Sequence, residues 1–203
     1  MILILIGALS IAMDIQVNKS IQIADNETKS DDCSTVNGKI TIGDHATVAG
    51  DCRTVNGPIR VGTNSKVKSL RTVNGTIKIA QGSSVSGDLE TVNGSIILSE
   101  VSVLGNIETV NGRIRLTHTS ARKDLTTVNG HIDLTEKSHV AGNIIIKDSH
   151  RTWTHRQPIE ILIADDSVVD GDIRVQDDDL DVIVYLKDGG TVKGDIINAK
   201  VVH

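Results

Sequence analysis

The tetrapeptide Thr-Val-Asn-Gly at residues 35–38 occurs five more times in this 203-residue chain, at intervals of 18 or 19 residues. A unit this short holds too few apolar residues to enclose a core of its own, so each copy must bury its apolar side against the next copy. The repeat therefore predicts a solenoid, one elongated body made of stacked coils. The later copies begin at Thr54, Thr72, Thr91, Thr109 and Thr127.

The residues between the motifs predict β-structure. In the copy at 72–90, the apolar residues Val73, Ile77, Ile79 and Val85 stand in short alternating runs separated by Gly, Asn and Ser, a pattern typical of short strands with tight corners. We expect an all-β fold, a single-stranded parallel β-helix of triangular cross-section with 18–19 residues per coil. Right-handed winding is favoured over left-handed winding, because the coils depart from the strict six-residue spacing of left-handed hexapeptide helices.

The repeat also predicts how the chain is divided. Regular motif-bearing coils span 35–145, residues 147–158 interrupt them, and Val-x-Gly-Asp-Ile elements without the motif indicate further coils over 159–203. We therefore expect a single β-helix domain, 13–203. One Trp, one Tyr and no Phe fit a thin core filled by Val, Ile and Leu.

Residues 2–12 (ILILIGALSIA) form an apolar run of the length found in secretory signal peptides, too short to span a bilayer. Ser10 and Ala12 are the small residues that favour cleavage before Met13, although no basic residue precedes the run. We expect a signal peptide at 1–12, a periplasmic or secreted mature protein and no transmembrane segment in the mature chain. A buried first strand is the alternative.

Cys33 and Cys52 occupy the same place in two neighbouring copies, two residues before the motif. Stacked strands would place their Cα atoms about 4.8 Å apart, within the range that a disulfide accepts. In an oxidising compartment we expect these residues to form a disulfide. Two small buried thiols are the alternative.

The asparagine of each motif predicts a ladder of side-chain amides along one corner, as in cross-β stacks. We interpret this ladder as structural, and we attribute the Asn-Gly pair to a left-handed backbone at a sharp corner. The ladder residues are Asn37, Asn56, Asn74, Asn93, Asn111 and Asn129.

The interruption at 147–158 is the candidate binding site, because long insertions in solenoids form loops that often bind partners. Such a loop could instead cover exposed sheet. Its candidate binding residues are His150, Arg151, Trp153, His155 and Arg156.

We expect structural roles for the other residues whose side chains could act in catalysis or metal binding. His45, His118, His131 and His139 fall at different places of their coils, so we expect no catalytic or metal-binding cluster and no cofactor. Asp177–Asp179 could bind calcium, but the known calcium-loop patterns are missing. An aspartate recurs before the motif strand, where we expect it to accept backbone hydrogen bonds rather than bind a cation. Its copies are Asp32, Asp51, Asp88 and Asp124.

The residues that follow the motif form a mildly basic face. This face is either only solvated, or it binds anionic polysaccharide or lipid head groups. Since the net charge is −5 and no long basic run occurs, nucleic acid is not an expected partner. The basic residues are Lys39, Arg60, Lys78, Arg113 and Arg115.

The motif copies and the Val-x-Gly-Asp-Ile elements resemble those of the adhesin-type, β-strand-repeat family of bacterial envelope proteins, over about residues 17–196. The coils at 159–196 are also similar to bactofilins, cytoskeletal β-helices that assemble end to end. The resemblance implies a right-handed parallel β-helix and brings no catalytic residues with it.

From these observations we expect a non-enzymatic, exported β-helix that acts as a structural, adhesion or scaffold module of the bacterial envelope. Its expected partners are further copies of itself or envelope polysaccharide. One alternative is a bactofilin-like scaffold that polymerises. The other is a β-helix enzyme, either polysaccharide-active or a hexapeptide-type acyltransferase.

Overall fold

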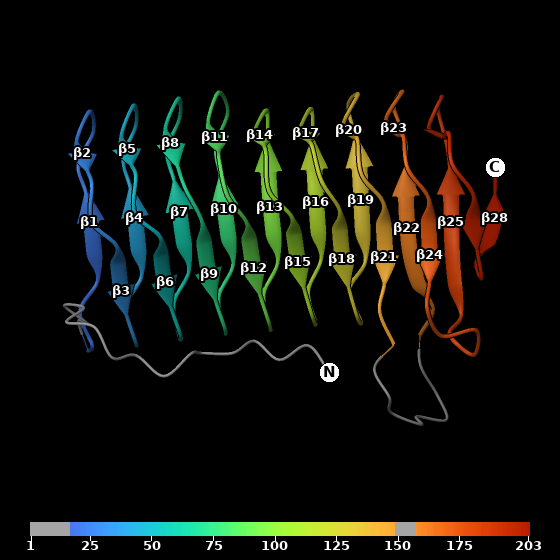
Figure 1. The fold of residues 1–203 in the computed structure, drawn as a ribbon, viewed down its shortest axis with the longest axis horizontal. Coiled ribbons are helices and arrows are strands. Elements are labelled where there is room, and N and C mark those ends of the chain that lie inside the picture. Colours follow the sequence, from blue (N-terminus) through green and yellow to red (C-terminus); the bar gives the residue numbers. More distant parts are fainter. Residues whose placement is uncertain (1–16, 149–156) are drawn as a thin grey trace.

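The computed structural model describes residues 17–148 and 157–203. In these ranges the chain forms 28 β-strands and no helix, and therefore no helix that could cross a membrane. Successive strands contribute to three parallel sheets in turn, so that β1–β27 make nine coils of three strands each (Figure 1). The predicted all-β parallel solenoid with three sides is confirmed. The predicted signal peptide at 1–12 lies outside the described residues.

The ten-stranded sheet is formed by the strands that follow the motif. It extends over the full described length, and its middle strands alternate buried and outward-facing residues. Its strands are β1 (Ile21–Ile23), β4 (Ile40–Ile42), β7 (Ile59–Val61), β10 (Ile77–Ile79), β13 (Ile96–Ser99), β16 (Ile114–Thr117), β19 (Ile132–Thr135), β22 (Ile159–Ile163), β25 (Val182–Leu186) and β28 (Lys200–Val202).

The short-strand sheet consists of two-residue strands, in which the second residue faces the interior in most coils. Its strands are β2 (Thr28–Lys29), β5 (Thr47–Val48), β8 (Lys66–Val67), β11 (Ser84–Val85), β14 (Ser102–Val103), β17 (Ser120–Ala121), β20 (His139–Val140), β23 (Val168–Val169) and β26 (Thr191–Val192).

The motif sheet consists of the strands that end at the motif threonine and of their equivalents in later coils. Its strands are β3 (Cys33–Thr35), β6 (Cys52–Thr54), β9 (Leu70–Thr72), β12 (Leu89–Thr91), β15 (Ile107–Thr109), β18 (Leu125–Thr127), β21 (Ile144–Ile146), β24 (Ile173–Val175) and β27 (Ile196–Ile197).

Equivalent residues of successive coils lie directly over one another. Ile59, Ile77 and Ile96 are partners in the ten-stranded sheet, and all three side chains are fully buried. Burial of branched side chains in such columns supplies the main stabilisation, on the order of 2 kcal/mol for each side chain. The described sheet register fits either hand of winding, so the right-handed sense stays a prediction.

The motif threonine faces the interior, although the apolar pattern in the sequence grouped the motif valine Val73 with the core residues Ile77 and Ile79. Thr72 is 4% exposed, whereas Val73 lies half-buried at the corner. Strand alternation turns Leu70 and Thr72 inward, and the Thr72 hydroxyl donates a hydrogen bond of 3.0 Å to the carbonyl oxygen of Gly57 in the preceding coil. This hydrogen bond offsets the cost of burying a hydroxyl group.

The motif glycine is required for close approach between coils, not for a left-handed backbone as we expected. None of the six motifs contains a residue with positive φ. A Cβ atom at Gly94 would lie 1.8 Å from the carbonyl oxygen of Gly75 in the preceding coil. The left-handed residues of the described chain include His45, Asn64 and Gly82, which lie between the ten-stranded and short-strand sheets.

Candidate functional site

The corner between the motif sheet and the ten-stranded sheet carries the predicted asparagine ladder. The Asn56 side-chain amide donates to Asn37 Oδ1 at 2.8 Å, and Asn74 donates to Asn56 at 2.8 Å. The same bond recurs in every coil up to Asn129, and the ladder begins one coil before the first motif, at Asn18. These exposed amides are therefore occupied with one another along the edge of the molecule.

The corner before the motif sheet carries a second ladder, made of Asp and Asn side chains. The backbone N–H of Asp51 donates to Asp32 Oδ1 at 2.8 Å, and that of Asn143 donates to Asp124 Oδ1 at 2.7 Å. Asp88 accepts the backbone N–H of Asn106 in the same way. The interpretation as backbone acceptors is confirmed for Asp32, Asp88 and Asp124. The carboxylate of Asp51 instead lies 2.9 Å from Arg53 and 3.2 Å from Lys68.

The remaining corner carries a buried hydroxyl ladder that we did not predict. The backbone N–H of Ser65 donates to Ser83 Oγ at 3.0 Å, and that of Thr119 donates to Ser138 Oγ at 3.2 Å. Ser65 and Ser138 are fully buried. The signal was present in the sequence, because a hydroxyl residue precedes the short strand in many coils, but each copy looked like an ordinary polar turn.

The two cysteines lie where the spacing predicted. Cys33 and Cys52 are register partners on β3 and β6, and both are buried. They are free thiols in this structure rather than the expected disulfide. The hydrogen bond between the thiols lowers the pKa of Cys33, while the same bond together with burial raises the pKa of Cys52. Cys33 is therefore the sulfur that ionises first.

The described histidines do not converge on one place. His45 and His118 both adopt a left-handed backbone at the same type of corner, so our assignment of them to different places was wrong, but three coils separate them. His131 Nδ1 accepts the backbone N–H of Glu160, and His139 Nε2 lies 2.8 Å from Asp170 Oδ2. The rings of His118, His131 and His139 are thus each engaged with a local partner.

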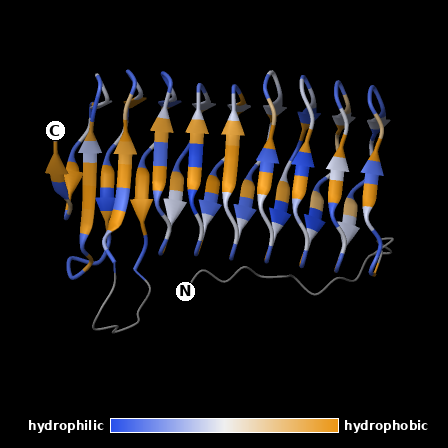
Figure 2. Cartoon of the chain, turned by 180° about the vertical axis from the view of Figure 1, so that it is seen from behind, coloured by the Kyte–Doolittle hydropathy of each residue, from blue (hydrophilic) through white to orange (hydrophobic). Residues whose placement is uncertain are grey.

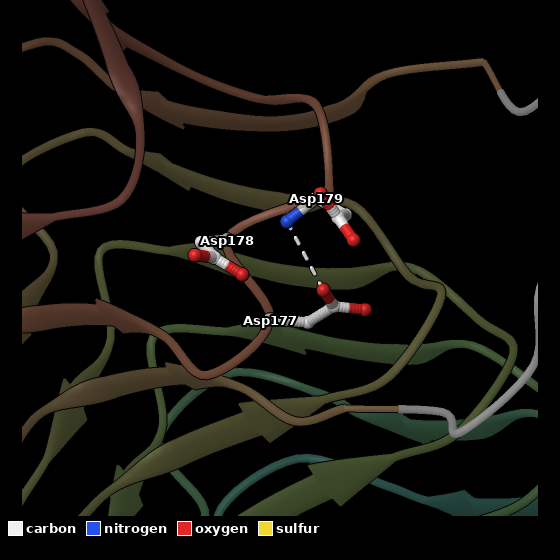
Figure 3. Close-up of side chains that lie close together, drawn as sticks. All are labelled: Asp177, Asp178 and Asp179. Atoms are coloured by element: carbon white, nitrogen blue, oxygen red, sulfur yellow. Dashed lines mark hydrogen bonds between the residues drawn. The ribbon is translucent and has the colours of Figure 1, made fainter.

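Three consecutive carboxylates gather after β24. Asp177, Asp178 and Asp179 each offer an oxygen within 4.8 Å of the others, and they project from one turn (Figure 3). The backbone N–H of Asp179 donates to Asp177 Oδ1 at 3.0 Å, which is the ordinary closure of an Asp turn. Asp178 and Asp179 are exposed to solvent. The turn chemistry accounts for this arrangement without a bound ion.

The predicted binding residues His150, Arg151, Trp153, His155 and Arg156 lie outside the described residues. Just before them, Lys147 Nζ lies 3.6 Å from Glu108 Oε2 on the outer face of the motif sheet. On the same face Arg71 Nη2 lies 3.0 Å from Glu90 Oε1. Burial raises the pKa of Glu90, the Arg71 guanidinium opposes that shift, and the neighbouring Glu108 carboxylate adds to it.

The predicted basic residues all lie on the ten-stranded sheet or directly before one of its strands. Arg113 Nη1 and Arg115 Nε lie 2.8 and 3.3 Å from Asp133 Oδ2, which belongs to the next coil. We call Lys39, Arg60, Lys78, Arg113 and Arg115 the basic face.

Comparison of the chain with known protein families, with characterised proteins and with solved structures finds no match. A β-strand-repeat solenoid is what the structure supports. The resemblance to adhesin-type envelope proteins and to bactofilins therefore rests on the repeated motifs alone, and membership of either family stays a prediction.

Proposed function

We propose that this protein is a non-enzymatic, exported scaffold or adhesion module of the bacterial envelope, in which a rigid rod presents long flat faces. The observation that carries the proposal is that the polar side chains at the corners bond successive coils to one another. Asparagine, aspartate and hydroxyl side chains at the three corners hold successive coils together. Side-chain hydrogen bonds at the three corners thus tie many of the successive coils together, as a mechanical or spacing element requires.

The described titratable groups are dispersed over the molecule, and this supports the non-enzymatic part of the proposal. Acid–base catalysis requires positioned groups around one substrate site. Here His139 pairs with Asp170 on the short-strand side, whereas Glu90 and Glu108 lie on the motif sheet. The charged groups are distributed along the rod instead of facing a common point.

Cell fractionation of the full-length chain tests the location. We expect the full-length protein outside the inner membrane, and a variant lacking residues 2–12 in the cytosol. Leu5→Arg is the matched control, because it breaks the apolar run without shortening the chain, and it should also stay in the cytosol. Recovery of all three proteins in the cytosol would overturn the export proposal.

An activity assay on purified cell-wall polysaccharide tests the non-enzymatic role. We expect no release of soluble sugar by the purified protein. Release that disappears when one carboxylate, such as Glu90 or Asp170, is replaced by its amide would show that the protein is an enzyme.

A second candidate is a scaffold that polymerises end to end. It is favoured by apolar side chains on the last described coil, where Ile197, Val201 and Val202 are each more than 40% exposed. Exposed apolar groups next to an unpaired strand promote association between molecules. Negative-stain microscopy and light scattering test this candidate, since filaments would support it and a strict monomer at high concentration would refute it.

A further inference from the structure

Positive charge is concentrated on the outer face of the ten-stranded sheet. From β4 to β16, the outward side chains of the strands and the residue before each strand include the five cations of the basic face and no carboxylate. The first carboxylate in these columns is Asp133 on β19. Because the whole chain has a net charge of −5, this face differs in sign from the molecule that carries it.

The middle of the basic face is not neutralised within the described part of the protein. Arg60 and Lys78 are direct register partners on β7 and β10, both are exposed, and neither has a carboxylate partner among the described residues. Neighbouring strands lie about 4.8 Å apart, and like charges placed opposite each other on adjacent strands are destabilising. The protein therefore maintains a repulsive pair on an exposed surface.

The arginines of the motif sheet show that this arrangement is not general. Arg53, Arg71 and Arg174 lie 2.9, 3.0 and 2.6 Å from the carboxylates of Asp51, Glu90 and Asp172. Of the five arginines within described strands, Arg60 alone lacks such a partner. Unpaired cations in a cluster of one sign attract anionic partners.

The shape of the basic face fits a linear partner. Its strand-centre column runs from coil to coil through Arg60, Lys78, Ile97 and Arg115 along the long axis of the molecule (Figure 1). A polyuronate has one carboxylate per sugar, and a sugar unit is about as long as the distance between neighbouring strands. Such a polymer, lying along this column, presents a row of carboxylates to a row of cations.

Two other polyanionic partners fit less well. Nucleic-acid grooves use aromatic side chains on which bases stack, and none occurs on this face between β4 and β16. Surfaces that insert into membranes carry large apolar side chains among the cations. The outward residues of this part of the sheet offer only Ile97, which is half-buried.

We propose that the basic face binds a linear acidic polysaccharide lying along the solenoid axis, with Arg60 and Lys78 as its principal charged contacts. This inference names a partner for the scaffold and rests on the proposed envelope function. Binding is electrostatic, so it weakens as salt rises and the charges are screened.

The test uses the full-length protein and polygalacturonate, with neutral dextran as the control polymer, in affinity electrophoresis at low and physiological salt. We expect binding to polygalacturonate only, and a loss of about tenfold in affinity for Arg60→Glu/Lys78→Glu. The matched control is Arg122→Glu/Lys123→Glu, which makes the same charge change at two exposed corner positions away from the basic face and should bind as the unmodified protein does. Arg60→Gln/Lys78→Gln, which removes charge without reversing it, should lose part of the affinity, and circular dichroism checks that each variant is folded.

Equal losses in the two charge-reversed variants would show a general charge effect and overturn the inference. So would absence of binding at low salt, or tighter binding to phosphatidylglycerol vesicles that depends on the same two residues. Failure of the envelope function is seen separately, because a cytosolic location would leave polymer binding in the purified protein unchanged.

Discussion

The motif-bearing coils at 35–145 and the coils at 159–203 solve the same stacking problem with different residues. In the first region most strands of the ten-stranded sheet turn a polar or charged residue outward at their centre, such as Lys78 between Ile77 and Ile79, and Ile97 on β13 is an exception. In the second, β22 and β25 are five residues long and turn Leu162 and Tyr185 outward as register partners. Figure 2 shows the result, with banded strands in most coils of the motif region, apart from β13, and nearly continuous apolar strands near the C-terminus.

The difference shows that register can be specified either at the corners or along the strands. Within the described residues the asparagine ladder extends as far as Asn129, and the coils from residue 159 onward have no motif threonine or motif glycine. They instead pair more residues per strand, five between β22 and β25 against three between β7 and β10. We infer that stability depends on corner residues in the first region and on strand length and apolar packing in the second.

The largest expected effect comes from the motif glycine. Gly94→Ala places a Cβ against the backbone carbonyl of Gly75, so neighbouring coils must separate, and we expect a loss of about 3 kcal/mol or more in the free energy of unfolding. Gly87→Ala is the control, because the new Cβ would first meet the movable Ser69 hydroxyl, with the nearest backbone atom at 3.1 Å. Urea denaturation compares them, and equal losses would contradict the role assigned to close coil contact.

The next largest expected effect is the stability that a disulfide would add to the first coils. Oxidation to a Cys33–Cys52 disulfide closes a short loop between register partners and should stabilise the protein by about 3 kcal/mol. Thermal unfolding with and without reductant measures this gain. Cys33→Ser should abolish the difference between the two conditions. A pair that stays reduced in exported protein, detected by thiol labelling, would contradict the expected disulfide.

A smaller effect is expected from the amide ladder. Asn74→Ala removes the bond that Asn74 donates to Asn56 and the bond that it accepts from Asn93. Since both bonds are exposed to water, the expected loss is about 1 kcal/mol. Gln81→Ala, at another exposed corner of the same coil, should cost less. If Asn74→Ala and Gln81→Ala unfold at the same urea concentration, the corner ladder does not contribute to stability.

The smallest expected effect is the change of thermal stability with pH, and it mainly tests the later coils. Hydrogen bonds from Lys193 and His139 lower the pKa of Asp170, and the bond from Arg174 lowers that of Asp172. Carboxylates with lowered pKa values stabilise the folded state above their unfolded pKa of about 3.9, and the contribution is lost as pH falls through the lower folded value. Thermal midpoints should therefore fall below about pH 4. Asp170→Asn should reduce this acid dependence, and an unchanged profile would contradict it.

The sequence predicted the fold and the register, because equal spacing forces equivalent residues to stack. The spacing alone is enough to place Cys33 beside Cys52 and to align the ladder asparagines. The prediction of the core residues from the sequence was wrong inside the motif. Hydropathy favoured Val73 as the core residue, but Thr72 takes that position because its hydroxyl finds a carbonyl acceptor in the preceding coil, a contact that depends on three-dimensional stacking.

The candidate site was less predictable than the fold. The hydroxyl ladder was missed because Ser65 and Ser83 resemble ordinary turn residues until the backbone N–H of one is seen to meet the hydroxyl of the other. The basic residues were identified, but the carboxylate shared by Arg113 and Arg115 and the unpaired state of Arg60 follow only from the register between coils.

The coil-to-coil register has a consequence for how such a molecule changes length. Removing residues 72–90 would join Arg71 directly to Thr91, which is the register partner of Thr72, so the shortened chain would continue with the same motif at the same corner. Every interface in the shortened rod would be of a type already present. Duplication or loss of whole repeats thus changes the length of the rod in steps of one strand spacing.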